Sequence, residues 1–534
     1  MLLRKIFTIS RLIFSGPSDP KISQLHNYFI QEAGVLNPVK TKRIIAVQGI
    51  EVPFYYAILG QITLNIRRRI NISGSLLLIR SLAVGKSFRA LLGRNEIISY
   101  LKSAQWARIN KEIVGNIGYR SHSFNYFFKD LTDLWSAYIN WCRLENTNEI
   151  IKFEIHNILV GDLIIDSYLR FKPSASFQLK DRFVWRIIWQ AYRDIRRANA
   201  FFSNHKPVLY LSSYSSYIQH GVPVRVALAN NVPVYVFGSS DVFGKKLTSN
   251  DFFHTASPET SNYKILFDRL DHQEERLYEA SKQLDLRLSG GIDHATRYMK
   301  ISAYAKSSET VPDVKNAVVV FLHDFLDSYH IFDQVIFHDF WEWVVCTIET
   351  LVKYCIPFYL KPHPNQIPES EQAVILLMEK YPDVKMISSR ITNTQLVDAG
   401  MICGVTVYGT VAVELAYMGI PTIACARHLY NSFDFCRTAK SLEEYINFLK
   451  NPKYRPLPIS EMRRQALTFF YMDKIYGGDN LIDLRYQLSE LQCVMEDNEG
   501  DSRAMINELK KLQDLASYKN LIDNLVVEIN NQNI

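Results

Sequence analysis

The sequence predicts an α/β protein with two Rossmann-like domains facing a cleft, each a parallel sheet wound with helices. Short buried apolar runs alternate with longer helical runs in both halves of the chain. This rhythm is typical of parallel strands joined by right-handed crossovers. At 534 residues the chain is also too long for one hydrophobic core, and its 48% apolar and 22% charged residues are ordinary globular values.

In the first half, a buried strand is predicted at 42–49, and a helix through 53–64 follows it. A second apolar run occupies 76–79, and the aromatic-rich stretch 95–147 is amphipathic, which predicts helices. The remaining elements of this half are a helix at 183–203, a strand at 207–213, a helix through 225–229, a strand at 232–237 and a periodic helix at 265–288.

The second half repeats the rhythm after a polar segment at 306–315, where we place the domain boundary. Its predicted strands are 317–322, 357–360, 401–407 and 422–426, and its predicted helices are 337–354, 370–380, 411–418 and 441–450. The sequence therefore predicts an N-terminal Rossmann-like acceptor domain with helical insertions at 1–310, a C-terminal Rossmann-like donor domain at 311–460 and a helical, polar tail at 461–534.

The charge and the cysteines restrict the class of partner. The net charge is +7, which suits anionic partners such as nucleotide diphosphates, acidic glycans or an anionic membrane face. The basic clusters are short and no nucleic-acid motif stands out, so no nucleic-acid partner is expected. The seven cysteines form no CxxC pair, which fits a reducing cytosol and argues against a disulfide framework or a cysteine zinc site.

No run approaches the roughly 18 uncharged apolar residues that span a bilayer. The first 16 residues mix apolar and basic side chains, and they predict no signal peptide because Arg11 interrupts the apolar run. Two interpretations of this segment stay open: an element packed on the protein, which we prefer, or an amphipathic helix lying on a membrane. We expect a cytoplasmic protein, with peripheral association at the inner face of the membrane as a further expectation.

Ligands of parallel sheets bind at the carboxyl ends of the strands, so polar residues just after strands are the candidates. The first group is Lys361-Pro362-His363-Pro364, directly after the strand at 357–360. Prolines stiffen the chain, while the lysine and the histidine offer cationic or hydrogen-bonding groups to a phosphate. A stiff turn in which the protein itself satisfies His363 is the alternative.

The second group, Tyr408, Gly409, Thr410 and Glu414, follows the strand at 401–407 and opens the next helix. Gly409 lets the backbone approach a ligand closely, and Thr410 is predicted to cap the helix, whose N-terminus would attract phosphate. Glu414 comes four residues after Thr410, not at the capping-box position. We expect Glu414 to accept hydrogen bonds from sugar or ribose hydroxyls, and a solvated side chain is the alternative.

The third group is His323, Asp324 and Asp327, right after the strand at 317–322, with His330 close behind. We expect contact with phosphate or acceptor. A metal site built from these residues is a weaker hypothesis, because the ligand spacing is not that of a known metal motif, and a polar surface loop is a third possibility.

Four residues of the first half are candidates for a general base beside an acceptor hydroxyl. Asp162 and Asp166 lie close together in the sequence, His220 follows the strand at 207–213, and Asp241 follows the strand at 232–237. Nothing in the sequence ranks them, and each one alone is more often structural.

The second-half motifs resemble the capsule polysaccharide biosynthesis family, which includes bacterial Kdo transferases. The shared pattern is His363-Pro364, then Gly409-Thr410, Glu414, Gly419 and Pro421, within about residues 317–450. The resemblance implies a GT-B fold that holds the donor nucleotide in its C-terminal domain, with His363 at the donor phosphate and Gly409 and Thr410 near the nucleotide. Teichoic-acid glycerophosphotransferases and polysialyltransferases carry a similar histidine-proline element.

We therefore expect a metal-independent glycosyltransferase of capsule or lipopolysaccharide biosynthesis. Its donor would be a nucleotide-sugar substrate, a CMP-linked sugar being one candidate, and its acceptor a glycan or glycolipid, with no separate cofactor. Polyol-phosphate transfer of the teichoic-acid type, sugar-nucleotide epimerisation on the same fold, and a non-catalytic glycan-binding assembly subunit stay open as alternatives.

Overall fold

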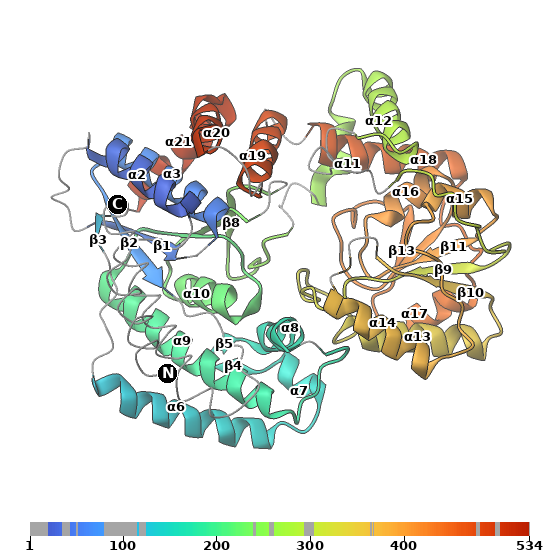
Figure 1. Ribbon diagram of the computed structural model, residues 1–534, viewed down its shortest axis with the longest axis horizontal. Helices are drawn as coiled ribbons and strands as arrows, with labels where there is room; N and C mark the ends of the chain where they lie inside the picture. Colours follow the sequence, from blue (N-terminus) through green and yellow to red (C-terminus); the bar gives the residue numbers. More distant parts are fainter. Residues whose placement is uncertain are drawn as a thin grey trace. The chain divides into compact units, whose positions relative to one another are not determined.

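The computed structural model describes residues 20–34, 43–49, 52–78, 115–116, 124–172, 174–238, 242–255, 261–292, 304–363, 366, 368–476, 481–496 and 502–532. These residues form two compact units (Figure 1). Unit 1 comprises residues 1–167, 179–254 and 483–534, and unit 2 comprises residues 168–178 and 255–482.

Unit 1 is built on a six-stranded sheet with the order β3-β2-β1-β6-β7-β8. The first five strands run parallel, and β8 pairs with β7 in the antiparallel direction. The parallel part has the Rossmann order 3-2-1-4-5, which reverses direction between β1 and β6. The strands are β1 (Ile44–Gly49), β2 (Ser73–Leu78), β3 (Gly115–Asn116), β6 (Leu209–Ser212), β7 (Val234–Val236) and β8 (Lys245–Leu247).

The helices of unit 1 connect and cover this sheet. They are α2 (Pro20–Gly34), α3 (Pro53–Arg69), α6 (Phe124–Arg143), α7 (Thr147–Ile151), α8 (Gly161–Phe171, whose last turn belongs to unit 2), α9 (Arg182–His205) and α10 (Tyr217–Ala229). A small antiparallel pair, β4 (Glu154–Ile155) and β5 (Ile158–Leu159), lies between α7 and α8 in the sequence.

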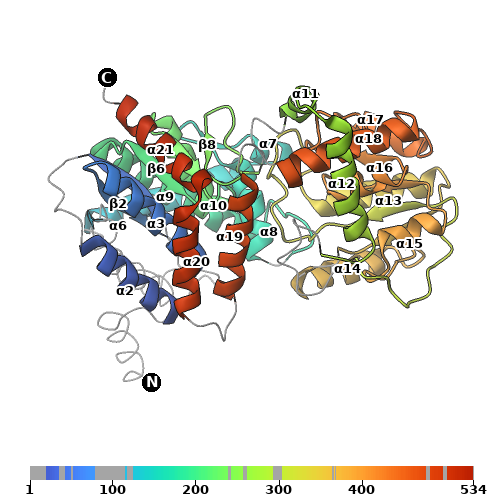
Figure 2. The same cartoon turned by 90° about the horizontal axis from the view of Figure 1, so that it is seen from above.

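The C-terminal helices belong to unit 1, although they follow unit 2 in the sequence. They are α19 (Leu481–Glu496), α20 (Ser502–Asp514) and α21 (Ala516–Asn531). The buried Tyr518 accepts a hydrogen bond from Asn65 of α3 at 3.1 Å, and Gln513 donates to Tyr28 of α2 at 3.0 Å. Figure 2 shows these red helices beside the blue N-terminal ones. Residues 483 onward, predicted as part of a tail, thus complete the first domain.

Unit 2 contains a five-stranded, wholly parallel sheet with the order β10-β9-β11-β12-β13. Its strands are β9 (Val318–Phe321), β10 (Phe358–Lys361), β11 (Cys403–Val405), β12 (Thr422–Ala424) and β13 (Cys436–Thr438). Its helices are α11 (Tyr263–Asp268), α12 (Gln273–Leu288), α13 (Phe340–Lys353), α14 (Pro368–Lys380), α15 (Asn393–Asp398), α16 (Val411–Tyr417), α17 (Leu442–Lys450), α18 (Ile459–Phe470) and the π-helix Tyr471–Tyr476.

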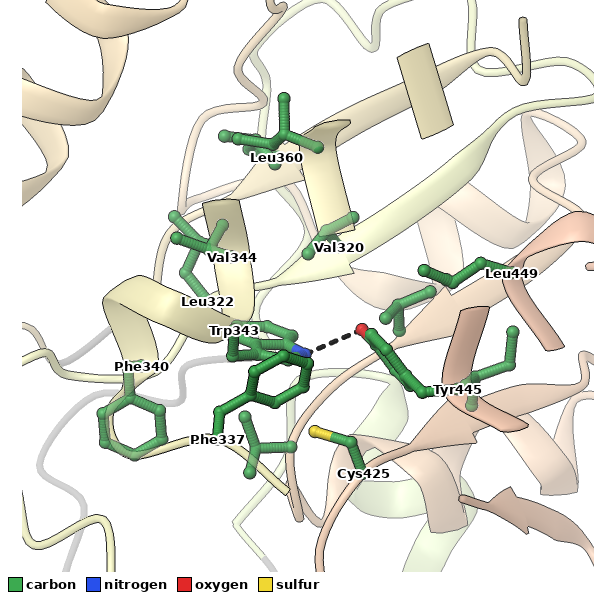
Figure 3. Close-up of a cluster of buried hydrophobic side chains, with 14 of the residues drawn as sticks. Val320, Leu322, Phe337, Phe340, Trp343, Val344, Leu360, Cys425, Tyr445 and Leu449 are labelled. Carbon is green, nitrogen blue, oxygen red and sulfur yellow. Dashed lines mark hydrogen bonds between the residues drawn. The ribbon is translucent and has the colours of Figure 1, made fainter. Parts of the chain in front are cut away.

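Alternate residues of β9 enter different cores on the two faces of this sheet. Val318 and Val320 pack with α13, α14 and α17, whereas Val319 packs with α15 and α16 (Figure 1). In the first core the fully buried Trp343 donates a hydrogen bond from Nε1 to the hydroxyl of Tyr445 at 2.8 Å (Figure 3). This bond joins α13 to α17 and gives both buried polar groups a partner, so it fixes the two helices that cover this face of the sheet.

The predicted α/β class with two Rossmann-like sheets is confirmed, whereas their arrangement about a cleft stays a prediction. The predicted boundary near residue 310 differs from the observed passage between His254 and Thr255. The reason is that α11 and α12 share a hydrophobic core with α16 and α18 of unit 2. Periodicity identified the helix at 265–288 but could not tell which sheet it covers.

Candidate functional site

The candidate site in unit 2 lies at the carboxyl ends of β9, β10 and β11. The order 2-1-3-4-5 reverses between β9 and β11, and ligands bind open α/β sheets at such a switch point. His323 follows β9, Lys361 is the last residue of β10, and Tyr408 and Gly409 follow β11. The three second-half groups predicted from the sequence therefore begin at one edge of one sheet.

His323 is held in one orientation by the loop after β11. The amide of Val407 donates a hydrogen bond to its Nε2 at 3.3 Å, and the hydroxyl of Thr406 lies 2.9 Å from the same nitrogen. Because the Val407 amide can only donate, Nε2 accepts, so the Thr406 hydroxyl also donates to it while the Thr406 oxygen accepts from the amide of Gly409 at 3.1 Å. The ring stacks on Phe340 with centroids 4.7 Å apart and planes 9° apart. Nε2 is thus an acceptor, and the ring proton resides on Nδ1.

Burial lowers the pKa of His323 to about 3, and the nearby His363 acts in the same direction. The imidazole is therefore neutral near pH 7 and presents Nδ1–H as a fixed donor. No residue in the part of the chain that the structure describes accepts a hydrogen bond from this nitrogen. A fixed neutral donor of this kind can bind a phosphate or sugar oxygen.

Lys361 brings a positive charge to the same edge. Its side chain is buried, with the residue 6% exposed, and within the described ranges it makes no hydrogen bond or ion pair. Burial lowers its pKa to about 8, while the Glu414 carboxylate acts in the opposite direction. Its Nζ lies 5.9 Å from the centroid of the Phe321 ring, and an anion arriving here would stabilise the charged form of the lysine.

Glu414, on α16, is buried and already bonded to protein donors. Its carboxylate accepts hydrogen bonds from the hydroxyl of Tyr304 at 2.9 Å and from the side-chain amide of Asn393 at 2.8 Å. Burial raises its pKa, while these two donors, Arg287 and Lys361 lower it. Glu414 is thus a carboxylate held by its own donors, and its charge acts on Lys361 without forming an ion pair with it. Its oxygens keep further lone pairs, and contact with ribose or sugar hydroxyls stays a prediction.

The turn before α16 has a steric reason for Gly409, but it does not contain the predicted helix cap at Thr410. A Cβ on Gly409 would lie 2.7 Å from the Thr406 oxygen, so a larger residue would disturb the hydrogen bonds that orient His323. The predicted cap is wrong: Thr410 has φ −63° and ψ −12°, already helical, and its side chain makes no capping hydrogen bond. Thr410 is an exposed residue at the opening of a seven-residue helix.

The loop after β9 is organised by its own carboxylates. Asp324 accepts a hydrogen bond from the amide of Leu326 at 3.0 Å, and the exposed Asp327 accepts one from the amide of Ser328 at 2.9 Å. Tyr408 donates its hydroxyl to the carbonyl of Ser328 at 3.0 Å and so ties this loop to the one after β11. The described residues include no group of three or more metal-ligating side chains, so nothing in them supports the metal hypothesis.

His363 is exposed, and its electrostatic surroundings connect it to the same group. Partial desolvation lowers its pKa, the nearby Asp324 raises it, and the nearby Lys361 lowers it. His363 therefore lies within electrostatic range of both side chains, as its position beyond β10 predicts. Pro364 lies outside the described residues.

Two of the predicted bases in unit 1 are buried. Asp162, in the first turn of α8, accepts hydrogen bonds from both terminal nitrogens of Arg225, one at 2.7 Å. Arg225 also donates to the carbonyl of Leu159 and stacks on Phe252, 4.2 Å from its ring centroid. A carboxylate engaged in this way is a structural ion pair, which corrects its assignment as a base.

Asp166, one turn further along α8, is 1% exposed and therefore equally inaccessible as a base. Asp241 lies outside the described residues. His220, on α10, remains: its Nδ1 lies 2.6 Å from the side-chain amide nitrogen of Gln48 at the end of β1. This places His220 at the switch point of the first sheet, between the carboxyl ends of β1 and β6.

Comparison with known proteins gives weak likenesses. No protein-family model and no curated protein matches the chain. Among solved structures, it is similar to Thermosulfurimonas dismutans KpsC, a beta Kdo 2,4 transferase, with 15% identity, 49% of this chain and 79% of that chain covered, and a TM-score of 0.29. The Methanocaldococcus jannaschii UDP-GlcNAc 2-epimerase, in complex with UDP-GlcNAc and UDP, has 10% identity, coverage of 59% and 94%, and a TM-score of 0.24.

The wall teichoic acid polymerase TagF is also similar, with 10% identity, 95% of this chain and 98% of that chain covered, and a TM-score of 0.20. At TM-scores below 0.5 these likenesses carry no argument about what this chain binds.

Sequence reasoning missed two residues that orient the histidines. Thr406 and Gln48 are both polar residues at the ends of otherwise apolar strands, Thr406 directly after β11 and Gln48 within β1. That polarity is the signal that could have found them, because a buried polar side chain needs a partner.

Proposed function

We propose that the chain is a glycosyltransferase that moves a sugar from a nucleotide-activated donor to a bacterial capsule or lipopolysaccharide glycan. Unit 2 binds the donor and unit 1 binds the acceptor. The observation that supports this best is the buried, unpaired cation of Lys361 beside the fixed N–H donor of His323, at a switch point. The motif resemblance at His363, Gly409 and Glu414 supports the same assignment.

The chemistry of transfer suits this arrangement. The bond between the anomeric carbon and the donor phosphate oxygen breaks, and negative charge develops on the leaving phosphate. A preorganised cation and neutral N–H donors stabilise such charge without reorganisation. Since Lys361 supplies positive charge directly, we propose that transfer needs no metal; a rate unchanged by EDTA is expected, and loss of activity on chelation would contradict it.

A nucleotide panel tests the donor site. Thermal unfolding of the full chain is measured with CMP, CDP, UDP and GDP; one of them, at about 100 times its Kd, should stabilise the protein by about 2.7 kcal/mol. Lys361→Met should weaken this nucleotide at least about tenfold, because a hydrogen bond to a charged group contributes about 1.5–3 kcal/mol. Lys440→Met, at an exposed lysine of the same unit, is the control and should leave binding unchanged.

No stabilisation by any nucleotide would sink the proposal, and glycan retention with no nucleotide binding would favour a non-catalytic assembly subunit. Donor-hydrolysis screens with CMP-, UDP-, GDP- and CDP-linked donors separate sugar transfer from polyol-phosphate transfer and epimerisation, and they identify the nucleobase of the donor.

In the transfer assay, His363→Ala should abolish turnover while the protein stays folded. Wild-type turnover in that variant would remove His363 from the mechanism.

We also propose that the enzyme works at a membrane surface, and α6 supports this. Leu131, Trp135 and Tyr138 are 43%, 64% and 40% exposed on this amphipathic helix, which also carries the exposed Lys129 and Arg143, while its other face packs on α9. Aromatic side chains on such helices insert at the headgroup boundary, and basic ones attract anionic lipid. No helix among the described residues is long and apolar enough to cross the bilayer.

Sedimentation with vesicles of mixed anionic and zwitterionic lipid tests this surface. Trp135→Ser should reduce the bound fraction, because it removes a large, 64% exposed aromatic side chain from α6. Tyr278→Ser changes another aromatic residue, 62% exposed on α12, and should leave the bound fraction unchanged. Equal binding by wild type and Trp135→Ser would exclude α6 as the contact.

A further inference from the structure

A second group of polar residues lies at the switch point of unit 1, separate from the Lys361 group. Gln48, near the end of β1, directs its side-chain oxygen at the residues that follow β6. This oxygen accepts a hydrogen bond from the amide of Ser213 at 2.8 Å, and it lies 2.7 Å from the Ser213 hydroxyl and 3.2 Å from the Ser212 hydroxyl. The amide nitrogen of Gln48 faces Nδ1 of His220 at 2.6 Å.

These contacts assign the orientation of the glutamine amide. A backbone N–H can only donate, so the atom of Gln48 that faces the Ser213 amide must be the oxygen. The atom that faces His220 is then the NH2 group, which can only donate. Nδ1 of His220 must therefore accept, and the proton of the neutral ring resides on Nε2.

The surroundings keep the ring neutral. Burial lowers the pKa of His220 to about 4 and that of the neighbouring His254 to about 3, with His220 and Lys245 acting on His254 in the same direction. Within the described part of the chain, no residue accepts a hydrogen bond from Nε2 of His220. Near pH 7 this nitrogen is an N–H donor that lacks the lone pair a general base needs.

We propose that His220 binds an oxygen of the acceptor saccharide through Nε2–H, with Gln48 as the positioning residue that sets its tautomer, and that His220 is not the general base. This inference rests on the proposed function. The neighbours favour a neutral sugar: the ring of Tyr214 lies 5.9 Å from that of His220, the hydroxyl of Tyr55 meets that of Tyr214, and His254 is neutral beside Ser215. Aromatic rings and neutral donors fit saccharide hydroxyls.

The tautomer can be measured without any substrate. In full-length protein carrying 15N-labelled histidine, the His220 resonances are assigned by their absence in His220→Gln. We expect a neutral ring with Nε2–H from pH 5 to pH 8. A proton on Nδ1, or titration of His220 near its ordinary pKa of about 6.5, would overturn the proposal.

Gln48→Glu is the sharper variant in the same experiment. A carboxylate at position 48 can only accept, so Nδ1 should become protonated, and the pKa of His220 should rise because of the adjacent negative charge. An unchanged tautomer in this variant would show that Gln48 does not set it.

The catalytic role is tested by transfer to glycan fragments that accept sugar from the wild-type enzyme. His220→Gln keeps an N–H donor in place of Nε2–H and should retain most of the rate, whereas His220→Ala should lose about tenfold, the loss expected for one hydrogen bond. A general base would instead lose about 10²–10⁴-fold in both variants. If wild type transfers nothing, the proposed function fails, and the NMR result still decides the tautomer.

Discussion

The switch point of each unit holds a neutral histidine in one orientation by a hydrogen bond to one ring nitrogen, but the two switch points differ in charge. In unit 2, the loop after β11 donates to His323, and in unit 1 a glutamine held by the chain after β6 donates to His220. Each ring is neutral with one nitrogen fixed as an acceptor. At its switch point unit 2 adds Lys361, a buried lysine that forms no ion pair with a described residue, whereas Arg225, a buried cation of unit 1, is paired with Asp162. The same topology thus presents neutral donors in one unit and an anion site in the other.

The largest effect should come from breaking the paired charge of unit 1. Asp162→Ala leaves Arg225 buried without its carboxylate and should lower the free energy of unfolding by about 3–5 kcal/mol, measured by urea denaturation. Glu274→Ala, which breaks the exposed Arg464 pair, should change it by only about 0–1 kcal/mol. If Asp162 were a base instead, Asp162→Ala would abolish transfer at unchanged stability.

Removing Lys361 of unit 2 should have the opposite effect on the free energy of unfolding at neutral pH, because its charge is not paired with that of a described residue. The folded-state pKa of Lys361, about 8, lies below its ordinary value of 10.5. Between about pH 8 and pH 10.5 the unfolded chain binds more protons than the folded one, so stability rises with pH across this window and the penalty is fully present below it. The shift corresponds to about 3 kcal/mol.

Urea denaturation of wild type and Lys361→Met at pH 7 and pH 10.5 isolates this contribution. The variant should be at least as stable as wild type at pH 7, and its advantage should shrink as the pH rises. Nucleotide affinity of the wild type should fall over the same window, because the lysine loses its charge. A variant that is strongly destabilised at pH 7 would mean that Lys361 has a partner in the folded protein.

Much of unit 2 could be predicted from the sequence, because its signals are local. Each strand there is a short apolar run ended by polar residues, and carboxyl ends of parallel strands share an edge. That alone brings His323, Lys361 and Gly409 to the same edge of the sheet. The roles within the group could not be predicted, because the hydrogen bonds that hold Glu414 come from Asn393 and Tyr304, which lie 21 and 110 residues away in the sequence.

Unit 1 was harder to predict for the same reason. Gln48 and His220 are 172 residues apart, and no local pattern shows that they meet. Asp162 looked like a candidate base because it lies close to a second carboxylate, Asp166, in the sequence, yet its partner is the distant Arg225. The return of α20 and α21 to this unit depends on contacts such as Tyr518 with Asn65, which amphipathic periodicity cannot specify.

The smallest expected effect concerns Thr410. Since its hydroxyl caps nothing, Thr410→Ala should change the free energy of unfolding by less than about 0.5 kcal/mol. Thr392→Ala is the matched control in the same unit: Thr392 begins α15 in a capping box and accepts a hydrogen bond from the amide of Gln395 at 3.2 Å, so its loss should cost about 1 kcal/mol.

The nucleotide Kd should show the reverse order: the Thr410 variant should change it more than the Thr392 variant. If the exposed Thr410 contacts the donor, Thr410→Ala should weaken the stabilising nucleotide about three- to tenfold, the value of one neutral hydrogen bond, whereas Thr392→Ala should leave its Kd unchanged. Thermal unfolding in a nucleotide titration gives both quantities from the same samples. An unchanged Kd in Thr410→Ala would leave the anion site to Lys361 and His323 and remove the turn before α16 from the ligand contacts.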